Sequence, residues 1–464
     1  MRNSLYILGL LTISWTTPAL ATDPTVADYF SNCARPSDSG GRVLTVDPNR
    51  HGVGSYSDIA GALQVAKPGD TISLMTGDYG NLALNGINQG AFISIVGAKG
   101  QTPKFTNIFI GGFKPASRWR LSHLTISGFV PSADKKAQAT LIVMANSDNI
   151  VIDDSDLYAQ DGVIDWQALV PAKSPTNGVP NGISARQSSC VTIVNNRLRN
   201  IFNGIDFGGD QIDNHGQYFL IGGNSIDNFA GDGIDHYASH VRIEENRITN
   251  GHDICNNTCV HNDGIQGWNY NRLPVLNSDV TIESNVIVAQ TRPDLELPVD
   301  TLQGITIFDG KWADVKILNN LVVANAWHGI SLYGVDNAAV INNTVAPTNP
   351  SRNTWIMMHA AKGEPAGTAH SAVFRNNIFP GVINPRAPKP PGLISDHNLA
   401  LRTADDFKDA FVKFDPEHFS YDLHLAKGSD AIGEGSSEEA PKVDIEGHLR
   451  EAPFDIGAYA HQKK

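Results

Sequence analysis

The chain has 464 residues, of which 18% are charged and 41% are hydrophobic, and its formal net charge is −13. This negative charge, without any Lys/Arg cluster interleaved with aromatic residues, argues against binding to nucleic acid. An acidic polymer would also be repelled unless a cation or a local Arg or Lys intervenes. Beyond residues 1–21 no apolar segment reaches the roughly 20 residues of a membrane helix, so we expect no integral membrane span.

Residues 1–21 have the features of a secretory signal peptide. A basic start at Arg2 precedes an apolar stretch from Leu5 to Trp15, and Ala19-Leu20-Ala21 fits the small-residue rule for cleavage. The alternative, a membrane anchor, needs a longer apolar stretch. We therefore predict a secreted or periplasmic monomer. Residues 22–464 are expected to form one domain, with a capping segment at about 22–80, central coils at about 81–400 and a closing segment at about 401–464.

The four cysteines are Cys33, Cys190, Cys255 and Cys259. An even number of cysteines in an exported chain favours disulfide bonds. Cys255 and Cys259 enclose only a short loop, and if they pair with each other, Cys33 pairs with Cys190. A zinc site is the alternative, but the required Cys and His spacing is absent.

Six short runs begin with a Gly-Ile pair: NGISARQ at 181, NGIDFGG at 203, DGIDHYA at 232, DGIQGWN at 263, QGITIFD at 303 and HGISLYG at 328. Such self-similarity is typical of stacked coils, in which the same register repeats about every 4.8 Å. Side chains at equivalent positions of the six runs then form columns along the stack.

A second repeat supports the same architecture. Runs of β-branched residues end in an Asn that is followed, two residues later, by an aliphatic residue, at Asn196, Asn224, Asn246, Asn285, Asn320, Asn343 and Asn377. Asn tolerates a left-handed backbone and can hydrogen-bond to its neighbours, so we expect these residues to stack at a tight bend of each coil. The alternating V-x-I runs predict parallel strands with one face inward.

Together the coils resemble the right-handed parallel β-helix of many polysaccharide-active proteins, the pectate-lyase-like and polygalacturonase-like superfamily. Residues 56–80 are similar to the opening of that family, in which a short capping helix and a Lys-Pro-Gly-Asp turn lead into the first strand. GSDAIGEG at 428 and DIGAY at 455 resemble its closing segment. The resemblance implies an all-β, single-stranded right-handed parallel β-helix with an N-terminal capping helix. Because this fold hosts lyases, hydrolases, epimerases and binding proteins, the function has to come from the site.

If Ile points inward in each Gly-Ile strand, the residues before Gly, just after Ile and two further on face outward. The first two of these columns carry carboxylates in their middle coils, at Asp206, Asp232, Asp235 and Asp263. Like charges about 5 Å apart need a cation, a shared proton or a substrate to relieve their repulsion. We therefore predict Asp232, Asp235 and Asp263 as catalytic residues. The alternative is a solvated face on which Asp-Gly pairs simply form turns.

The third column is aromatic over four successive coils, at Tyr237, Trp268, Phe308 and Tyr333. Exposed rings beside carboxylates suit a sugar chain, because pyranose faces stack on flat apolar surfaces. We predict these residues, with Gln266, as substrate-binding. The alternative is that the rings pack beneath long insertions such as residues 286–302.

Histidines and cations supply further candidates. His261, in HNDGIQ beside the Asp cluster, is the preferred general base, and His328 in the first column is a further candidate that also faces substrate. By strict alternation His236 points inward, which favours a core histidine with its hydrogen bonds satisfied. Arg186 and Lys311 are expected to bind or neutralise a uronate carboxylate.

Two reactions fit this set of residues. The GDGID segment resembles the Asp-rich site of calcium-dependent pectate lyases, which implies Asp206, Asp232, Asp235 and Asp263 as Ca²⁺ ligands in β-elimination on a uronate polymer. Those enzymes carry a Lys at the position of Gln266, so another base would be needed. The second reaction is glycoside hydrolysis by paired Asp residues. A C5-epimerase or a non-catalytic carbohydrate-binding protein remains a further alternative, and β-elimination is slightly preferred.

Overall fold

The computed structural model describes residues 25–36, 40–49, 55–128, 140–162, 179–209, 216–252, 262–268, 275–293, 295, 302–349, 354–365, 368, 370–381 and 391–462. The predicted signal peptide, Cys255, Cys259 and His261 lie outside these residues. No helix within the described ranges is long and apolar enough to cross a membrane.

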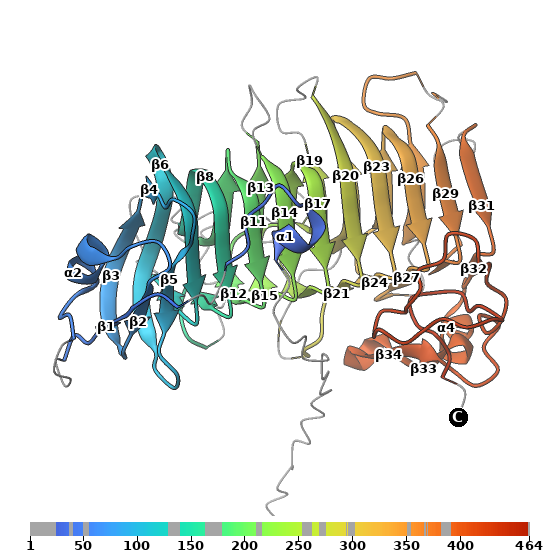
Figure 1. The fold of residues 1–464 in the computed structure, drawn as a ribbon. Coiled ribbons are helices and arrows are strands. Elements are labelled where there is room, and N and C mark those ends of the chain that lie inside the picture. Colours follow the sequence, from blue (N-terminus) through green and yellow to red (C-terminus); the bar gives the residue numbers. More distant parts are fainter. Residues whose placement is uncertain are drawn as a thin grey trace, which may run out of the picture.

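The strands are stacked as successive turns of one parallel coil (Figure 1). Each strand pairs in parallel with the strand one full turn later, as β10 (Asn181–Arg186) does with β13 (Ile205–Gly208), and β13 with β16 (Ile234–Tyr237). Three strands per turn therefore produce three parallel sheets around one core. The predicted parallel β-helix is confirmed.

Sheet one contains the Gly-Ile strands and carries the candidate site. Above β10, β13 and β16 it continues through β19 (Asn262–Trp268), β22 (Leu302–Phe308), β25 (His328–Tyr333) and β28 (Trp355–His359). Below β10 it continues into the first parts of β8 (Thr140–Asp153) and β6 (Pro103–Ser122), and into β3 (Gly77–Leu84).

Sheets two and three complete each turn. Sheet two consists of the later parts of β6 and β8 with β1 (Val43–Val46), β2 (Thr71–Leu74), β4 (Gly86–Ile87), β5 (Ile93–Gly97), β11 (Ser189–Val194), β14 (Gln217–Gly222), β17 (Ser239–Glu244), β20 (Leu276–Glu283), β23 (Lys311–Leu318), β26 (Val335–Ile341), β29 (Ala372–Arg375) and β31 (Leu393–Asp396). Sheet three contains β7 (Thr125–Ser127), β9 (Asp156–Tyr158), β12 (Arg197–Ile201), β15 (Ser225–Phe229), β18 (Arg247–Gly251), β21 (Val286–Val288), β24 (Leu321–Ala324), β27 (Thr344–Pro347), β30 (Ile378–Phe379) and β32 (Leu399–Ala400).

The Ile of every Gly-Ile pair points into the core, as predicted. All six, which are Ile183, Ile205, Ile234, Ile265, Ile305 and Ile330, are 0% exposed. Stacking one Ile on the next along the axis buries a continuous apolar column, which stabilises each turn against its neighbours. This column sets which residues of sheet one face outward.

The predicted asparagine ladder is confirmed and extends one turn further, to Asn398. In each turn the side-chain amide donates to the Oδ1 of the Asn above it, for example from Asn246 to Asn285 at 3.0 Å and from Asn377 to Asn398 at 2.9 Å. The expected left-handed conformation lies one residue earlier, as at Asn195 (φ 56°) and Asn319 (φ 54°). The ladder residue itself is therefore free to use its side chain for stacking.

A segment near each end of the chain packs against the coil. Helix α2 (Ile59–Val65) packs Ala62 into the first turn, and Asp58 caps it by accepting from the Gly61 amide at 2.9 Å, which confirms the predicted capping helix. At the other end α4 (Ala404–Ala410), the short helix η1 (Pro416–His418) and the antiparallel pair β33 (Phe411–Asp415) and β34 (Ser420–Leu425) bury apolar residues against the outer face of sheet three (Figure 1).

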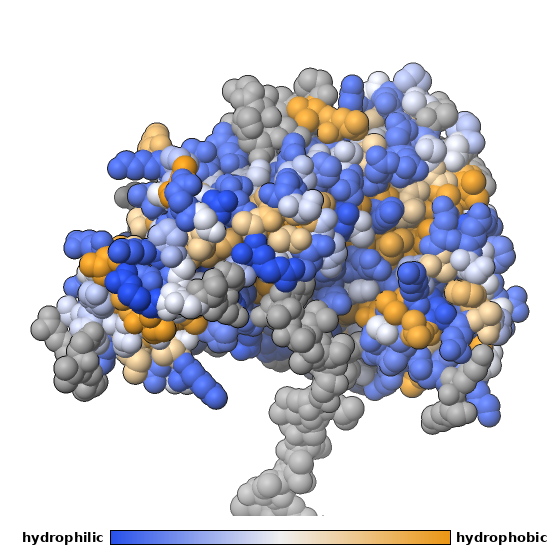
Figure 2. All heavy atoms as spheres, in the orientation of Figure 1, coloured by the Kyte–Doolittle hydropathy of each residue, from blue (hydrophilic) through white to orange (hydrophobic). Residues whose placement is uncertain are grey.

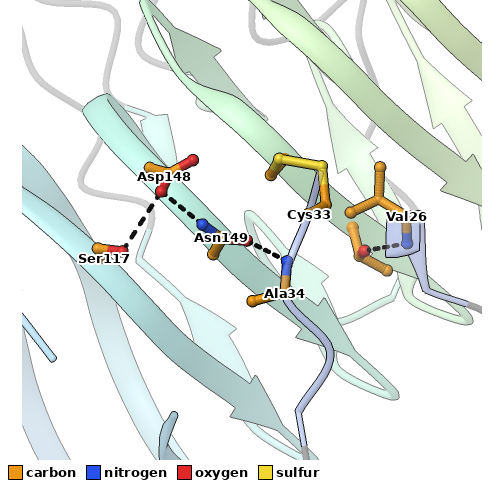
Figure 3. The surroundings of a disulfide bond; sticks show 8 residues. Val26, Cys33, Ala34, Ser117, Asp148 and Asn149 are labelled. Carbon is orange, nitrogen blue, oxygen red and sulfur yellow. Dashed lines mark hydrogen bonds between the residues drawn. A yellow bond between two sulfur atoms is a disulfide. The ribbon is translucent and has the colours of Figure 1, made fainter. Parts of the chain in front are cut away.

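Residues 25–36 form an N-terminal strap on the outside of sheet two. Its helix α1 (Val26–Tyr29) lies over β11 and β14 (Figure 1). The predicted Cys33–Cys190 disulfide is present and fastens the strap to β11. Figure 3 shows this region, where the Ala34 amide also donates to Asn149 Oδ1 at 2.6 Å. The surface on this side is predominantly hydrophilic with separate hydrophobic patches (Figure 2).

Candidate functional site

The predicted carboxylate column is present on the outer face of sheet one. Successive turns align Ser184, Asp206, Asp235, Gln266, Thr306 and Ser331 as direct partners. The Cα atoms of Asp206 and Asp235 are therefore about 4.8 Å apart, the spacing of neighbouring strands. Two carboxyl groups at this distance strongly influence each other's protonation.

Asp206 forms an ion pair with Arg186. The guanidinium forms an ion pair with Asp206 Oδ1, and the Ser184 hydroxyl donates to Oδ2 at 3.3 Å. The Asp206 side chain is 11% exposed, whereas that of Arg186 is 46% exposed. Arg186 was expected to meet a uronate carboxylate, but in the structure its guanidinium is engaged by the protein's own Asp206.

Asp235 has a different environment from Asp206 one turn below it. It is half-buried, and no hydrogen bond to its carboxyl group is found among the described residues. The pKa of Asp235 is raised well above its ordinary value, first because burial disfavours the charged form and then because Asp206 and Asp232 repel a second negative charge. The positive charge of Arg186 offsets this only in part. The surroundings of Asp235 therefore favour the protonated form of its carboxyl group.

The first column forms a hydrogen-bonded ladder of its own. The Asn181 side chain accepts a hydrogen bond from the backbone amide of Asn203 at 3.1 Å, and the Asn203 side chain accepts one from the backbone amide of Asp232 at 3.1 Å. Asp232 Oδ1 in turn accepts one from the backbone amide of Asp263 at 2.8 Å. This ladder fixes Asp232 beside Asp235 while leaving its side chain half-buried. Asp232 thus remains within reach of the outer face.

Asp263 departs from the prediction. It is 0% exposed, its Oδ2 accepts from Gln266 Nε2 at 2.7 Å, and its Oδ1 accepts from the Thr306 hydroxyl at 2.8 Å. The expectation that Asp263 acts on substrate is therefore wrong, because substrate cannot reach it. Gln266, at 6% exposure, is likewise buried and positions Asp263 instead of binding substrate.

The four carboxylates do not fit the predicted calcium site. Asp206 is engaged by Arg186 and Ser184, and Asp263 by Gln266 and Thr306. Within the described ranges, no group of three or more His, Cys, Asp or Glu side chains is placed to hold a metal ion. Ca²⁺ prefers six or more oxygen ligands, and these four carboxyl groups do not supply such a set together.

The aromatic column is present over three of the four predicted turns. Trp268, Phe308 and Tyr333 are half-buried on the outer edge of sheet one, and the rings of Phe308 and Tyr333 meet edge to face at 4.9 Å. Tyr237 is the exception. It is 7% exposed and belongs to the core, where its ring lies 6.2 Å from that of Trp312. The prediction that Tyr237 contacts substrate is wrong.

His236 points inward, as predicted, and is 1% exposed between Phe207 and Trp312. Neither ring nitrogen has a hydrogen-bond partner in the described part of the chain, so the expectation of a satisfied histidine is wrong. Burial lowers the pKa of His236 to about 3, and the ring stays neutral. It serves as a core residue beneath Asp235.

His328 lies among aromatic rings and accepts a hydrogen bond. Its Nδ1 accepts from Trp355 Nε1 at 3.1 Å, and because the indole only donates, this nitrogen carries no proton. The neutral ring is therefore the tautomer with its proton on Nε2. This tautomer suits a hydrogen-bond donor to substrate better than the predicted general base.

Sequence reasoning missed the strand above His328, because β28 has no Gly-Ile pair. It extends the columns with Met357 above Ser331 and His359 above Tyr333. The His359 ring lies 5.5 Å from that of Tyr333, and Trp327, which is 52% exposed, stacks on Trp355 at 6.3 Å. The aromatic surface thus continues beyond the predicted column.

Two predicted residues do not join this arrangement. Lys311 begins β23 in sheet two and is exposed there, beyond the corner that ends sheet one. His261 lies outside the described residues, so its role as a base stays a prediction. The site that the structure brings together is therefore Arg186, Asp206, Asp232 and Asp235, with Trp268, Phe308, His328, Tyr333 and His359 further along the axis.

A family model described as a right-handed beta helix region matches residues 174–345. Among solved structures, pectate lyase Pel9A is 12% identical with a TM-score of 0.47, covering 95% of this chain and 100% of that chain. The complex of XylC with xylose is 12% identical with a TM-score of 0.48, covering 91% and 99%. The family 28 exopolygalacturonase of Yersinia enterocolitica is 11% identical with a TM-score of 0.43, covering 78% of each chain.

No protein of curated function matches this sequence. The identities above are too low for the likeness to say anything about chemistry. The family model and the strand pairing agree, however, on the architecture. By fold the protein is a right-handed parallel β-helix, as the sequence predicted.

Proposed function

We propose that this protein is an enzyme that cleaves polysaccharide chains by glycoside hydrolysis. The observation that carries the proposal is the contrast between two neighbouring carboxyl groups. The pKa of Asp235 is raised, whereas Asp206 forms an ion pair with Arg186. A carboxyl group whose pKa is raised by burial and by neighbouring carboxylates is suited to donate the proton in glycoside cleavage.

In this mechanism Asp235 donates its proton to the glycosidic oxygen while the bond to the anomeric carbon breaks. Asp232 accepts a proton from the water that attacks that carbon. Asp235 is the third residue after Asp232, so their Cα atoms are at most about 10 Å apart and both side chains can act on one glycosidic bond. Asp206 acts through Asp235, because its negative charge raises the pKa of that carboxyl group, and Arg186 offsets part of this effect.

The aromatic surface supports a polymeric substrate. Phe308, Tyr333 and His359 lie two, three and four turns above Asp235, so the surface extends about 10 to 19 Å along the axis. Sugar rings stack on aromatic faces while their hydroxyls bond to polar groups nearby. A polysaccharide lying parallel to the axis would contact the aromatic surface and present one glycosidic bond to Asp235.

β-Elimination on a uronate polymer is the second candidate. It is favoured by the exposed portion of the Arg186 side chain, which can approach a carboxylate. It ranks second because Arg186 is already engaged by Asp206 and because the carboxylates do not converge on a cation. A C5-epimerase would share the first step of elimination and meets the same difficulty.

Export is part of the proposal. The Cys33–Cys190 disulfide supports it, since disulfides persist in oxidising compartments and are rare in the cytosol. The predicted signal peptide would deliver the chain to such a compartment.

Asp235→Asn tests the proposal, because an amide cannot donate the proton of a carboxylic acid. We expect the release of reducing ends from a panel of neutral and acidic polysaccharides to fall by about 10²- to 10⁴-fold. Asp405→Asn makes the same chemical change on the exposed side of α4 and serves as the matched control. Full turnover by a folded Asp235→Asn chain would contradict the proposal.

A further inference from the structure

A cleft of about 490 Å³ lies at the corner between sheets one and two, below the carboxylates. It is lined by Ile87, Pro115, Ala116, Ser117, Arg118, Asn146, Ser147, Asp148, Gln187 and Ser189. These residues come from β4, β6 and β8 and from the corner between β10 and β11. The volume is within the range of small-ligand sites.

The cleft exists because one turn of the coil is longer at this corner. Gly111 of β6 pairs with Ala145 of β8, and the next paired residues are Ala116 and Ser147. The chain therefore advances five residues in β6 but only two in β8 between these two pairs. The additional residues of β6 protrude from the corner, and Pro115 among them forms one wall. The cleft is therefore a local departure from the regular coil, which would otherwise leave the corner closed.

The lining has the composition that sugars select. Ile87, which is 52% exposed, and Pro115 offer an apolar surface. The Arg118 guanidinium contributes hydrogen-bond donors and the Asp148 carboxyl group contributes acceptors. Both charged side chains are anchored. An Arg118 guanidinium nitrogen donates to the Asn88 carbonyl at 3.3 Å, and Asp148 accepts from the Asn149 amide. An apolar face beside fixed polar groups matches the two kinds of surface on a pyranose ring.

The cleft also lies close to the carboxylates of sheet one. Gln187, in its lining, directly follows Arg186, the partner of Asp206. Arg186 and Gln187 belong to the turn of β10, which lies two turns below Asp235, or about 10 Å along the axis. A polymer that runs along the axis from Asp235 toward β10 therefore meets the cleft.

The wall of the cleft is braced from outside. Ser189 is followed by Cys190, whose disulfide to Cys33 fastens the strap, and Ala34 of the strap donates to Asn149, the neighbour of Asp148 (Figure 3). Ser117 and Asp148 lie beside this attachment in the same view. The strap therefore restrains the wall that carries Asp148.

We infer that this cleft is an accessory carbohydrate subsite, which holds a pyranose unit of the same polymer that is cleaved at Asp235. The inference rests on the proposed function, since the outer face of sheet one must hold a polysaccharide for the cleft to extend its binding surface. Arg118 and Asp148 bond to the ring hydroxyls or to a carboxylate of the sugar, and Ile87 contacts its apolar face. The subsite strengthens the binding of long chains and does not contact disaccharides held at Asp235.

Binding can be separated from cleavage by measuring it in the Asp235→Asn chain. Titration calorimetry would use di- and hexasaccharides of galacturonate, mannuronate, xylose and glucose, so that acidic and neutral sugars are compared. Adding Asp148→Ala, or independently Arg118→Ala, should weaken hexasaccharide binding about 10-fold and leave disaccharide binding within twofold, as expected for loss of one hydrogen bond to a charged group. Lys104→Ala, an exposed residue of β6 outside the cleft, is the control.

Unchanged hexasaccharide affinity in both folded cleft variants would overturn the subsite while leaving the proposed function standing. Equal weakening of di- and hexasaccharides would overturn it as well, because a subsite remote from Asp235 acts on long chains alone. Failure of the Asp235→Asn chain to bind any sugar of the panel would overturn both proposals. Circular dichroism before each titration shows that the variants are folded.

Discussion

Asp206→Asn should shift the pH dependence of activity in a direction that only the proposed arrangement predicts. Asp235 must be protonated to act as the acid, so activity falls as pH rises through its pKa, which is raised in the folded protein. The substitution removes a negative charge one turn away and leaves Arg186 as a positive neighbour. Both changes favour the ionised form of Asp235. The alkaline limb of the profile should therefore move to lower pH.

The size of the effect follows from the spacing of the turns. Two unit charges about 5 Å apart interact by about 3 kcal/mol at an effective dielectric constant near 20. An interaction of that size is readily measured in a profile of kcat/KM against pH. Asp405→Asn should leave the limb in place. An unmoved limb, or one displaced to higher pH, would refute the assignment of Asp235 as the acid under the influence of Asp206.

Two further predictions concern stability. Asn285→Ala removes a fully buried ladder amide that donates to the Asn320 Oδ1 and to the Ile243 carbonyl, and whose oxygen accepts from Asn246. It should cost at least about 3 kcal/mol in urea unfolding, and a loss below about 1 kcal/mol would contradict the structural role of the ladder. Cys33→Ser opens a cross-link between residues 157 apart, which should lower stability by about 3 to 5 kcal/mol, and an unchanged melting temperature would show that the strap contributes nothing.

The fold could be predicted because its signals are local and repeated. Each Gly-Ile pair placed an Ile in the core, and this alone fixed the register that brings Asp206 beside Asp235. The strand β28 was missed because its turn has no Gly-Ile pair. Asn343 and Asn377 are nevertheless successive ladder residues, so the interval between them indicates one complete turn. A repeat can thus be counted even where its leading motif is absent.

The site was harder to predict because its side chains are arranged by partners distant in sequence. Asp263 is drawn inward by Thr306 of the next turn, which no pattern within its own strand reveals. Tyr237 was placed outward by alternation, but the pairing of β16 with β19 ends at His236, so alternation no longer applies at the corner. The calcium prediction depended on four carboxylates converging, and two of them have other partners.

The central claim, hydrolysis at Asp235, is tested most directly by the chemistry of the products. Wild-type protein would be incubated with the polysaccharide panel, with calcium or with chelator, while reducing ends and absorbance at the unsaturated-uronate band are followed together. Hydrolysis predicts new reducing ends without absorbance, at the same rate in chelator. Rising absorbance that chelator abolishes would contradict it and establish calcium-assisted elimination.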